Sequence, residues 1–335
     1  MKYTNLGRTG MKVSKLCLGT MNFGPYTDEK DAFTIMDRAL EAGINFFDTA
    51  NEYGEYFGKG RTGWSEEIIG RWFKQGGGRR EKVIISSKVY NSMNDQNDGP
   101  HNDESLSAYK IRRHIEGSLR RLQTDHIELY QMHHIYREMT WEEGWEVFQA
   151  LVNQGKAYYI GSSNFAAWHI AKAQAAAEKR NFMGLVNEQH RYSLICRFPE
   201  LEVLPAAKDY GLGITVWGPL GGGLLGGNVK KPVEGGRVDR GIDRIQPHLH
   251  QSVEDYSKFC AEIGESESVV ALAWLLSNPT VTAPILGPRT LEQFETSLRA
   301  IEVELSEDIL KKLDEIFPGP CPGNTGMPAP EAYAW

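Results

Sequence analysis

The chain lacks several features that mark large classes of protein. No apolar run approaches the roughly 20 residues of a membrane-spanning helix, and the opening residues, MKYTNLGRTGMKVSKL, contain no apolar core like that of a signal peptide. The cysteines Cys17, Cys196, Cys260 and Cys321 are far apart, with no CxxC pair, so neither a zinc knuckle nor a disulfide framework is indicated. We therefore expect a cytoplasmic protein with reduced thiols, no membrane partner and no metal.

Basic charge is also scarce. Asp and Glu number 44 against 37 Lys and Arg, which gives a net charge of -7. A nucleic-acid partner favours a basic surface, so none is expected. The GxGxxG fingerprint of dinucleotide-binding folds does not follow the first strand-like run either, so any nucleotide must be held in another way.

Strand-like and helix-like segments alternate along the chain. Eight short β-branched or aromatic runs, LCLGT, INFFD, KVIISSK, HIELYQMH, AYYIGSS, GLVNEQ, GITVWG and VTAPILG, are separated by helical periodicity near residues 28–42, 65–75, 108–122, 141–153, 166–179, 201–210 and 269–277. A closing helix is expected near 290–300. This order predicts an α/β fold, a (β/α)8 TIM barrel that forms a single domain over residues 1–335.

Other segments lie outside the barrel repeat. An N-terminal β-hairpin, turned at Arg8 to Gly10, is expected to cover the barrel floor. Long loops are expected at the carboxyl face, above all the Gly-rich stretch from Gly221 to His250. The Pro- and Gly-rich tail from Phe317 is expected to lie across the barrel mouth or side without regular structure.

Polar residues stand at the ends of three consecutive strand-like runs. Asp48 closes INFFD, Lys88 closes VIISSK and His133 closes LYQMH, and Tyr53 follows Asp48 by five residues. Any one of them alone is more often a turn residue, a solvated charge or a packed aromatic. In a parallel barrel, however, the carboxyl ends of the strands converge on one face. The four together therefore predict one catalytic site.

The chemistry of this set suits the transfer of one proton to an oxygen that gains charge. A phenol, with a pKa of about 10, is a weak acid at neutral pH, and an adjacent ammonium stabilises its phenolate. Lys88 is therefore expected to lower the pKa of Tyr53, while Asp48 keeps Lys88 charged. A neutral His133 would donate a hydrogen bond to a carbonyl oxygen. Its neighbour His134 is expected to be an ordinary loop residue.

The chain resembles the aldo-keto reductase superfamily along GRTGMKVSKLCLGTMNFG, FFDTANEYG, ISSK, ELYQMHH, YIGSSNF, WGPLGGGLLGG and ILGPRTLEQ. The resemblance implies an NADPH-dependent (NADP+) oxidoreductase that reduces an aldehyde or ketone to an alcohol, with Tyr53 as general acid. Phrases such as QGGGRRE and PELEVLPAA are similar to bacterial nucleotide-deoxysugar ketoreductases and 2,3-reductases, which implies a keto-sugar as one candidate substrate.

Cofactor contacts are expected from the later strand ends. The amide and hydroxyl groups of Ser163, Asn164 and Gln189 suit a nicotinamide carboxamide, and the resemblance implies that Trp217 stacks on the ring. Arg289 stands beside a helix N-terminus and so suggests the 2′-phosphate of NADP. The full expected set is Gly19, Thr20, Met21, Asp48, Ser163, Asn164, Gln189, Trp217, Gly218, Pro219, Leu220, Gly221, Lys231, Arg237, Gly287, Arg289, Gln293 and Ser297.

The substrate pocket is expected to be aromatic, with walls from Phe23, Tyr56, Phe57 and Trp64. Two other functions stay open. A module that binds NADPH with little turnover, like the channel-associated β subunits, shares the fold. A lyase that forms a Schiff base on Lys88 would leave the amide groups of the later strands unexplained. The oligomeric state is not fixed by the sequence.

Overall fold

A closed barrel of eight parallel strands forms the centre of the computed structural model, which describes residues 1–56, 59–94, 103–227 and 247–320. Around the barrel the strands follow the order β3, β4, β7, β8, β9, β10, β11, β12 and close back on β3. Their bounds are β3 (Cys17–Gly19), β4 (Phe46–Asp48), β7 (Ile84–Val89), β8 (Ile127–Met132), β9 (Ala157–Ser163), β10 (Leu185–Arg191), β11 (Gly213–Trp217) and β12 (Val281–Leu286). The expected (β/α)8 barrel is confirmed.

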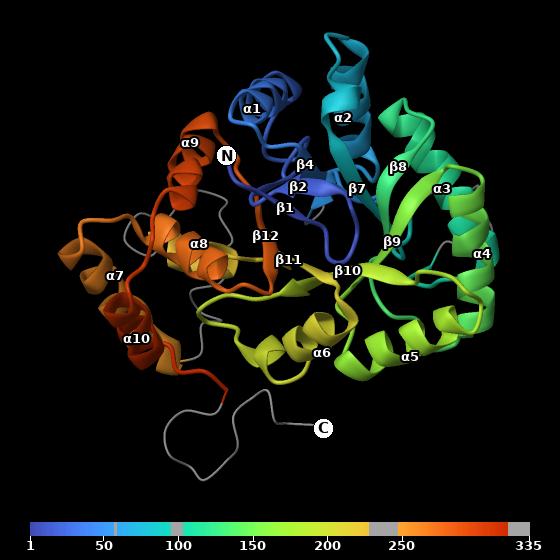
Figure 1. The fold of residues 1–335 in the computed structure, drawn as a ribbon. Helices are drawn as coiled ribbons and strands as arrows, with labels where there is room; N and C mark the ends of the chain where they lie inside the picture. The colour runs from blue at the N-terminus through green and yellow to red at the C-terminus, as the bar shows by residue number, and fades with distance from the viewer. Residues whose placement is uncertain (57–58, 95–102, 228–246, 321–335) are drawn as a thin grey trace.

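Helices surround the barrel, as Figure 1 shows. They are α1 (Glu29–Glu41), α2 (Trp64–Lys74), α3 (Ala108–Leu122), α4 (Trp141–Asn153), α5 (Ala167–Glu178), α6 (Val203–Tyr210), α7 (Pro247–Glu262), α8 (Glu267–Ser277), α9 (Leu291–Leu298) and α10 (Glu307–Ile316). Short 3-10 segments occupy Arg80–Lys82, Phe198–Glu200, Gly221–Gly226 and Arg299–Ile301. Side chains cap several of the helices: the Ser107 hydroxyl accepts from Lys110 N at α3, and Thr140 accepts from Glu143 N at α4.

The hydrophobic core has two parts. The larger part fills the space between the barrel and the helices. The smaller part lies inside the barrel, where Phe46, Leu129 and Val186 meet Leu6 and Val13 from the N-terminal hairpin. That hairpin, β1 (Tyr3–Asn5) and β2 (Lys12–Ser14), is antiparallel. Its two apolar side chains close the floor of the barrel, as the sequence predicted.

The hairpin turn is seated tightly against the barrel. Gly7 adopts a φ of +52°, and a Cβ there would lie 2.5 Å from Gly213 N and 2.6 Å from Val186 O. Arg8 N donates to Gly211 O at 2.7 Å. Only glycine combines this backbone conformation with this close approach. The turn thus fixes the floor to the strands β10 and β11.

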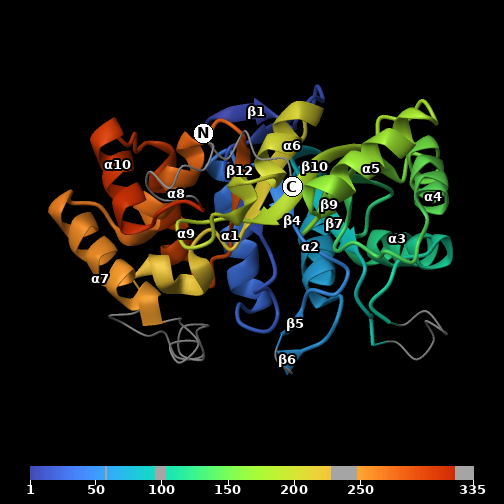
Figure 2. The same ribbon diagram turned by 90° about the horizontal axis from the view of Figure 1, so that it is seen from below.

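The opposite end of the barrel is the mouth. Figure 2 shows β1 at one end of the molecule and a second small hairpin, β5 (Glu55–Tyr56) and β6 (Lys59–Gly60), at the other. This second hairpin follows β4 and was not predicted. The prediction of one long loop from Gly221 to His250 is wrong at both ends, because Gly221–Gly226 forms a 3-10 segment and α7 begins at Pro247. Most of the loop lies outside the described residues, as does the tail beyond residue 320.

Candidate active site

The four residues of the predicted catalytic set meet at the mouth. Asp48 ends β4, Lys88 lies one residue before the end of β7, and His133 follows β8 directly. These three strands are neighbours in the barrel, with Asp48 paired to Ser86 and Lys88 paired to Gln131. Tyr53 lies in the connection between β4 and β5. Residues that are far apart in the sequence therefore lie close together in space, as expected for the carboxyl end of a parallel barrel.

A buried ion pair lies at the centre of the site. Lys88 Nζ donates to Asp48 Oδ2 at 2.6 Å and to the carbonyl oxygen of Thr49 at 2.8 Å. The Lys88 side chain is 0% exposed and that of Asp48 is 4% exposed. The other oxygen, Asp48 Oδ1, accepts from Ser86 Oγ at 3.1 Å and Gln189 Nε2 at 2.8 Å. Because both charges are hydrogen-bonded several times, the pair is tolerated in this buried position.

The same ammonium also contacts Tyr53. Lys88 Nζ donates to Tyr53 Oη at 3.4 Å and lies 4.8 Å from the centroid of its ring. Burial raises the pKa of Tyr53 to about 12, although the charge of Lys88 acts in the opposite direction. Burial also disfavours the charged form of Lys88, but Asp48 and Tyr53 more than offset it and raise its pKa above the ordinary value. At neutral pH the site therefore presents a protonated phenol beside an ammonium.

His133 completes the set. Its backbone N donates to Val89 O at 3.0 Å, and its ring lies edge-on to Tyr53 with centroids 5.8 Å apart. Burial, together with the charge of Lys88, holds the pKa of His133 well below its usual value, so the imidazole is neutral. His134 is exposed, stacks on His133 and contacts the Tyr90 ring at a tilt of 59°. The geometry thus places His133, rather than His134, against Tyr53.

A layer of polar side chains beneath the site was missed in the sequence. Gln131 Nε2 donates to Ser86 Oγ at 2.7 Å, and Asn187 Nδ2 donates to both Gln131 Oε1 and Thr215 Oγ1 at 3.0 Å. With Asp48 they form a hydrogen-bonded chain across the barrel. Each lies two residues before a predicted site residue, and strand side chains alternate between faces. That spacing of two is the signal that would have found them.

The predicted nicotinamide contacts lie next to the catalytic set. Gln189 pairs with Ser163 across β9 and β10, and both side chains are buried. Asn164 Nδ2 donates to His133 O at 3.1 Å, and Asn164 Oδ1 accepts from Trp217 Nε1 at 3.0 Å. The helix α5 is capped by Ala166, so Ser163 and Asn164 are not its caps. Hydroxyl, amide and indole groups at one strand-end cluster fit a planar carboxamide.

The predicted phosphate contacts form a second group, around β12 and α9. Thr290 caps α9 by accepting from Gln293 N at 3.3 Å, and Gln293 Oε1 accepts from Arg289 N at 2.9 Å. The Arg289 guanidinium lies 4.2 Å from the centroid of the Tyr26 ring. Ser297 Oγ donates to Gln293 O within α9. The helix N-terminus and the arginine are adjacent, and their part in binding an anion stays a prediction.

The remaining predicted cofactor residues are spread around the mouth. Thr20, after β3, donates from N and Oγ1 to Asp48 O at 3.0 and 3.1 Å. Asn22 Nδ2 donates to Gly287 O at 2.9 Å, which links the β3 and β12 ends. The other members at strand ends are Gly19, which ends β3, Met21, which follows β3, and Gly218, Pro219, Leu220 and Gly221, which follow β11. Lys231 and Arg237 lie outside the described residues.

The predicted substrate residues occupy different environments. Trp64 begins α2 and is half-buried, with the guanidinium of Arg61 5.8 Å from its ring centroid. Phe23 is fully buried in the larger core. Tyr56 lies in β5, and Phe57 is outside the described residues. Their part in a substrate pocket stays a prediction.

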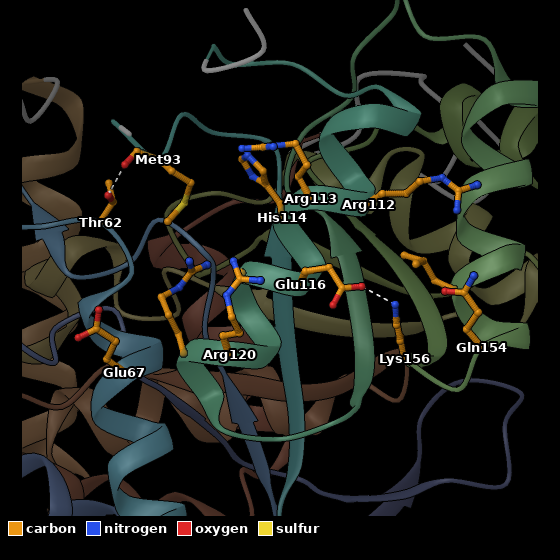
Figure 3. A pocket seen from close by; sticks show the side chains of 13 residues that line it. Thr62, Glu67, Met93, Arg112, Arg113, His114, Glu116, Arg120, Gln154 and Lys156 are labelled. Carbon is orange, nitrogen blue, oxygen red and sulfur yellow. Dashed lines mark hydrogen bonds and ion pairs between the residues drawn. The ribbon is translucent and has the colours of Figure 1, made fainter. Parts of the chain in front are cut away.

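A cavity of about 810 Å³ lies beside α3, and its lining also includes Thr62, Met93 and Lys156. Figure 3 shows its lining, which includes Arg112, Arg120, Lys156 and His114. None of the predicted catalytic or cofactor residues lines it. One lining residue is linked to the catalytic set: His114 Nδ1 lies 2.9 Å from the side-chain amide of Asn51, which precedes Tyr53 by two residues.

Neither a metal cluster nor a membrane-spanning helix occurs among the described residues. No cluster of three or more His, Cys, Asp or Glu side chains in this part of the chain has the arrangement of a metal site. Over the same residues, no helix is long and apolar enough to cross a membrane.

Comparison with known proteins identifies the family. A model described as "Aldo/keto reductase family" matches residues 15–317. The chain belongs to the aldo/keto reductase family. A relative from Bacillus subtilis (strain 168), "Uncharacterized oxidoreductase YrpG", is 60% identical over 335 residues, all of both chains. "Versiconal hemiacetal acetate reductase" from Aspergillus parasiticus is 30% identical, over 95% of this chain and 97% of the relative.

Another relative bears a different kind of name. "Probable voltage-gated potassium channel subunit beta" from Oryza sativa subsp. japonica is 31% identical, over 94% of this chain and 96% of the relative. Membership of an aldo/keto reductase family makes the chain an oxidoreductase that acts on small-molecule carbonyl compounds, in a family that generally uses nicotinamide cofactors.

Proposed function

We propose that this protein uses NADPH to reduce an aldehyde or ketone to an alcohol, with Tyr53 as the proton donor. The observation that carries the proposal is the position of Lys88, whose buried ammonium donates both to Asp48 at 2.6 Å and to Tyr53 at 3.4 Å. A phenol held against a fixed positive charge is suited to losing its proton as negative charge builds on a neighbouring oxygen.

Each side chain has a separate task in this proposal. As Tyr53 gives up its proton, Lys88 stabilises the phenolate that forms, which offsets part of the effect of burial on the pKa of the phenol. Asp48 keeps Lys88 charged and oriented. His133 is neutral, and in the tautomer that carries its hydrogen on Nε2 it donates a hydrogen bond that selects one orientation of the carbonyl.

The cofactor is held by the groups on the other side of the mouth. When bound, the nicotinamide supplies the hydride. Ser163, Asn164 and Gln189 bind its carboxamide and Trp217 covers one face of its ring. Arg289, beside the N-terminus of α9, binds the 2′-phosphate and so favours NADPH over NADH. We place the single domain of residues 1–335 in the cytoplasm, and a keto-sugar is among the candidate substrates.

Two alternatives are weaker. A cofactor-binding module with little turnover shares the fold, but it has no need of the complete Asp48, Tyr53, Lys88 and His133 set, and a relative named as a channel subunit is a member of the same family rather than support for this alternative. A Schiff-base lyase requires an unprotonated amine on Lys88. The ion pair with Asp48 raises the pKa of that amine despite its burial, which disfavours the free base.

One experiment separates the three. NADPH is titrated into the protein by tryptophan fluorescence, and its oxidation is then followed with a panel of aldehydes, ketones and keto-sugars. Saturable binding followed by oxidation with at least one carbonyl supports the reductase. Binding without oxidation of any carbonyl favours the module, and a borohydride-trapped adduct on Lys88 favours the lyase.

A further inference from the structure

A second carboxylate lies within the proposed site and has no part in the roles given so far. Glu52 directly precedes Tyr53, and its Oε1 lies 3.4 Å from His133 Nδ1. The side chains of His133 and Glu52 are 12% and 27% exposed. Among the described residues, His133 Nδ1 is a buried atom with no partner that satisfies hydrogen-bond geometry. A small rotation of Glu52 would therefore give this nitrogen its partner.

We propose that Glu52 is a positioning residue that determines which ring nitrogen of His133 carries the proton, and hence whether His133 can donate to a substrate oxygen. This inference rests on the proposed function, since it concerns the same site. It extends that function by adding a residue that contacts His133 rather than the substrate.

The argument follows from the chemistry of a neutral imidazole, which has one N–H and one lone pair. Because Nδ1 is buried against Glu52, Nε2 is the nitrogen that a substrate oxygen can reach. A protonated Glu52 donates to Nδ1, which leaves the hydrogen on Nε2, where it can be donated to a carbonyl. An ionised Glu52 accepts from Nδ1–H, which leaves only a lone pair on Nε2.

The surroundings place the change of tautomer near neutrality. Burial raises the pKa of Glu52 to about 6; Asn91 and Lys88 act against this, while Glu104 and Glu55 add to it. His133 itself stays neutral over this range, because burial, Lys88 and His134 all depress its pKa. Protonation of Glu52, and not of the imidazole, is thus the event that switches the ring.

The direct test reads the tautomer without any reaction. Histidine labelled with 15N is incorporated, and long-range proton–nitrogen spectra are recorded from pH 5 to pH 8, with His133→Asn assigning the signals. We expect the His133 proton to move from Nε2 to Nδ1 as pH rises through about 6. In Glu52→Gln and in Glu52→Ala we expect a single tautomer at every pH. The matched control Glu55→Gln, an exposed carboxylate at the start of β5, should keep the change, with a midpoint slightly lower because Glu55 helps to raise the pKa of Glu52. A His133 tautomer that is the same at all pH values in the natural protein, or one that still changes without Glu52, overturns the proposal.

The kinetic test joins the inference to the reaction. For a carbonyl that is reduced, kcat/KM should fall on the order of tenfold per pH unit above about 6 before it levels off. The fall should be absent in Glu52→Gln and present in Glu55→Gln. An unchanged fall in Glu52→Gln overturns the inference. If no carbonyl is reduced, the proposed function fails, whereas the spectra still decide whether Glu52 controls His133.

Discussion

Gln189 Nε2 donates to Asp48 Oδ1 at 2.8 Å, across the interior of the barrel mouth. One residue comes from the predicted cofactor side and the other from the predicted catalytic side. Because Asp48 Oδ2 is the acceptor for Lys88, a single carboxylate joins the two halves of the site. Gln189 and Lys88 therefore hydrogen-bond to the two oxygens of one carboxylate.

The ion pair itself is open to a stability test. Replacing Lys88 by Met leaves the buried carboxylate of Asp48 without its cation, and we expect the free energy of unfolding to fall by about 3–5 kcal/mol. Urea unfolding measures this change. Lys30→Met, at an exposed position of α1, is the control and should change stability by about 0.5 kcal/mol or less.

The double variant Asp48→Asn/Lys88→Met sharpens this test. Removing both charges should recover a large part of the lost stability, because no unpaired buried charge is left. Reduction of carbonyls should stay abolished in the double variant. A Lys88→Met protein as stable as the natural one would contradict the buried pair.

The floor of the barrel gives a second prediction. In Gly7→Ala the new methyl group would lie within 2.6 Å of three backbone atoms, at a φ of +52°, so we expect about 3 kcal/mol of destabilisation by thermal or urea unfolding. Gly10→Ala is the matched control in the same turn, since a Cβ there meets nothing within 4 Å. Equal stability of the two variants would show that the hairpin does not seat against β10 and β11.

The raised pKa of Glu52 predicts a pH-dependent stability. Between its ordinary value of 4.5 and about 6 the folded protein binds more protons at this residue than the unfolded chain does, so its contribution to stability falls as pH rises through that window. In Glu52→Gln there is no carboxylate to ionise, so the variant does not lose this stability as pH rises. The variant should match the natural protein near pH 4 and exceed it by about 1–2 kcal/mol above pH 6 in urea unfolding. A constant difference at all pH values would contradict the shifted pKa.

Cofactor selectivity tests the second group of residues. Arg289→Gln should raise KM for NADPH by roughly ten- to hundredfold and leave KM for NADH nearly unchanged, because a charge-assisted hydrogen bond to the 2′-phosphate is lost. Arg299→Gln, just past the far end of α9 and paired with Glu265, is the control and should alter neither. An equal rise in KM for NADPH and for NADH would show that Arg289 does not bind the 2′-phosphate.

Much of this fold could be predicted from the sequence where periodicity and capping agree. The helices α3 and α4 begin and end where the apolar spacing predicts, after the capping residues Ser107 and Thr140. The strand-end residues were found because a buried apolar run that stops at a polar side chain marks the carboxyl face of a barrel. Lys88 and Asp48 lie close together because both are at the carboxyl ends of neighbouring strands.

The rest was missed for identifiable reasons. Helix α10 has its signal in the Ser306 cap and the spacing of Ile309, Leu310 and Leu313, but it lies outside the barrel repeat on which the interpretation relied. Helix α7 (Pro247–Glu262) was missed as a whole, because the Gly-rich stretch before it was interpreted as a loop that continues to His250. Contacts between distant side chains, such as Glu52 with His133, leave no periodicity, because they depend on how loops cross the mouth. The pKa of Tyr53 depends mainly on its burial, and the spacing of residues in the sequence does not reveal how deeply a loop residue is buried.

The central claim is that Tyr53 supplies the proton. The most direct measurement is the single-turnover rate of NADPH oxidation in the presence of an accepted carbonyl, for the natural protein and for Tyr53→Phe. The account predicts a rate lower by about 10²–10⁴ in Tyr53→Phe, with NADPH bound as tightly as before. A variant that oxidises NADPH at the natural rate would show that another group donates the proton.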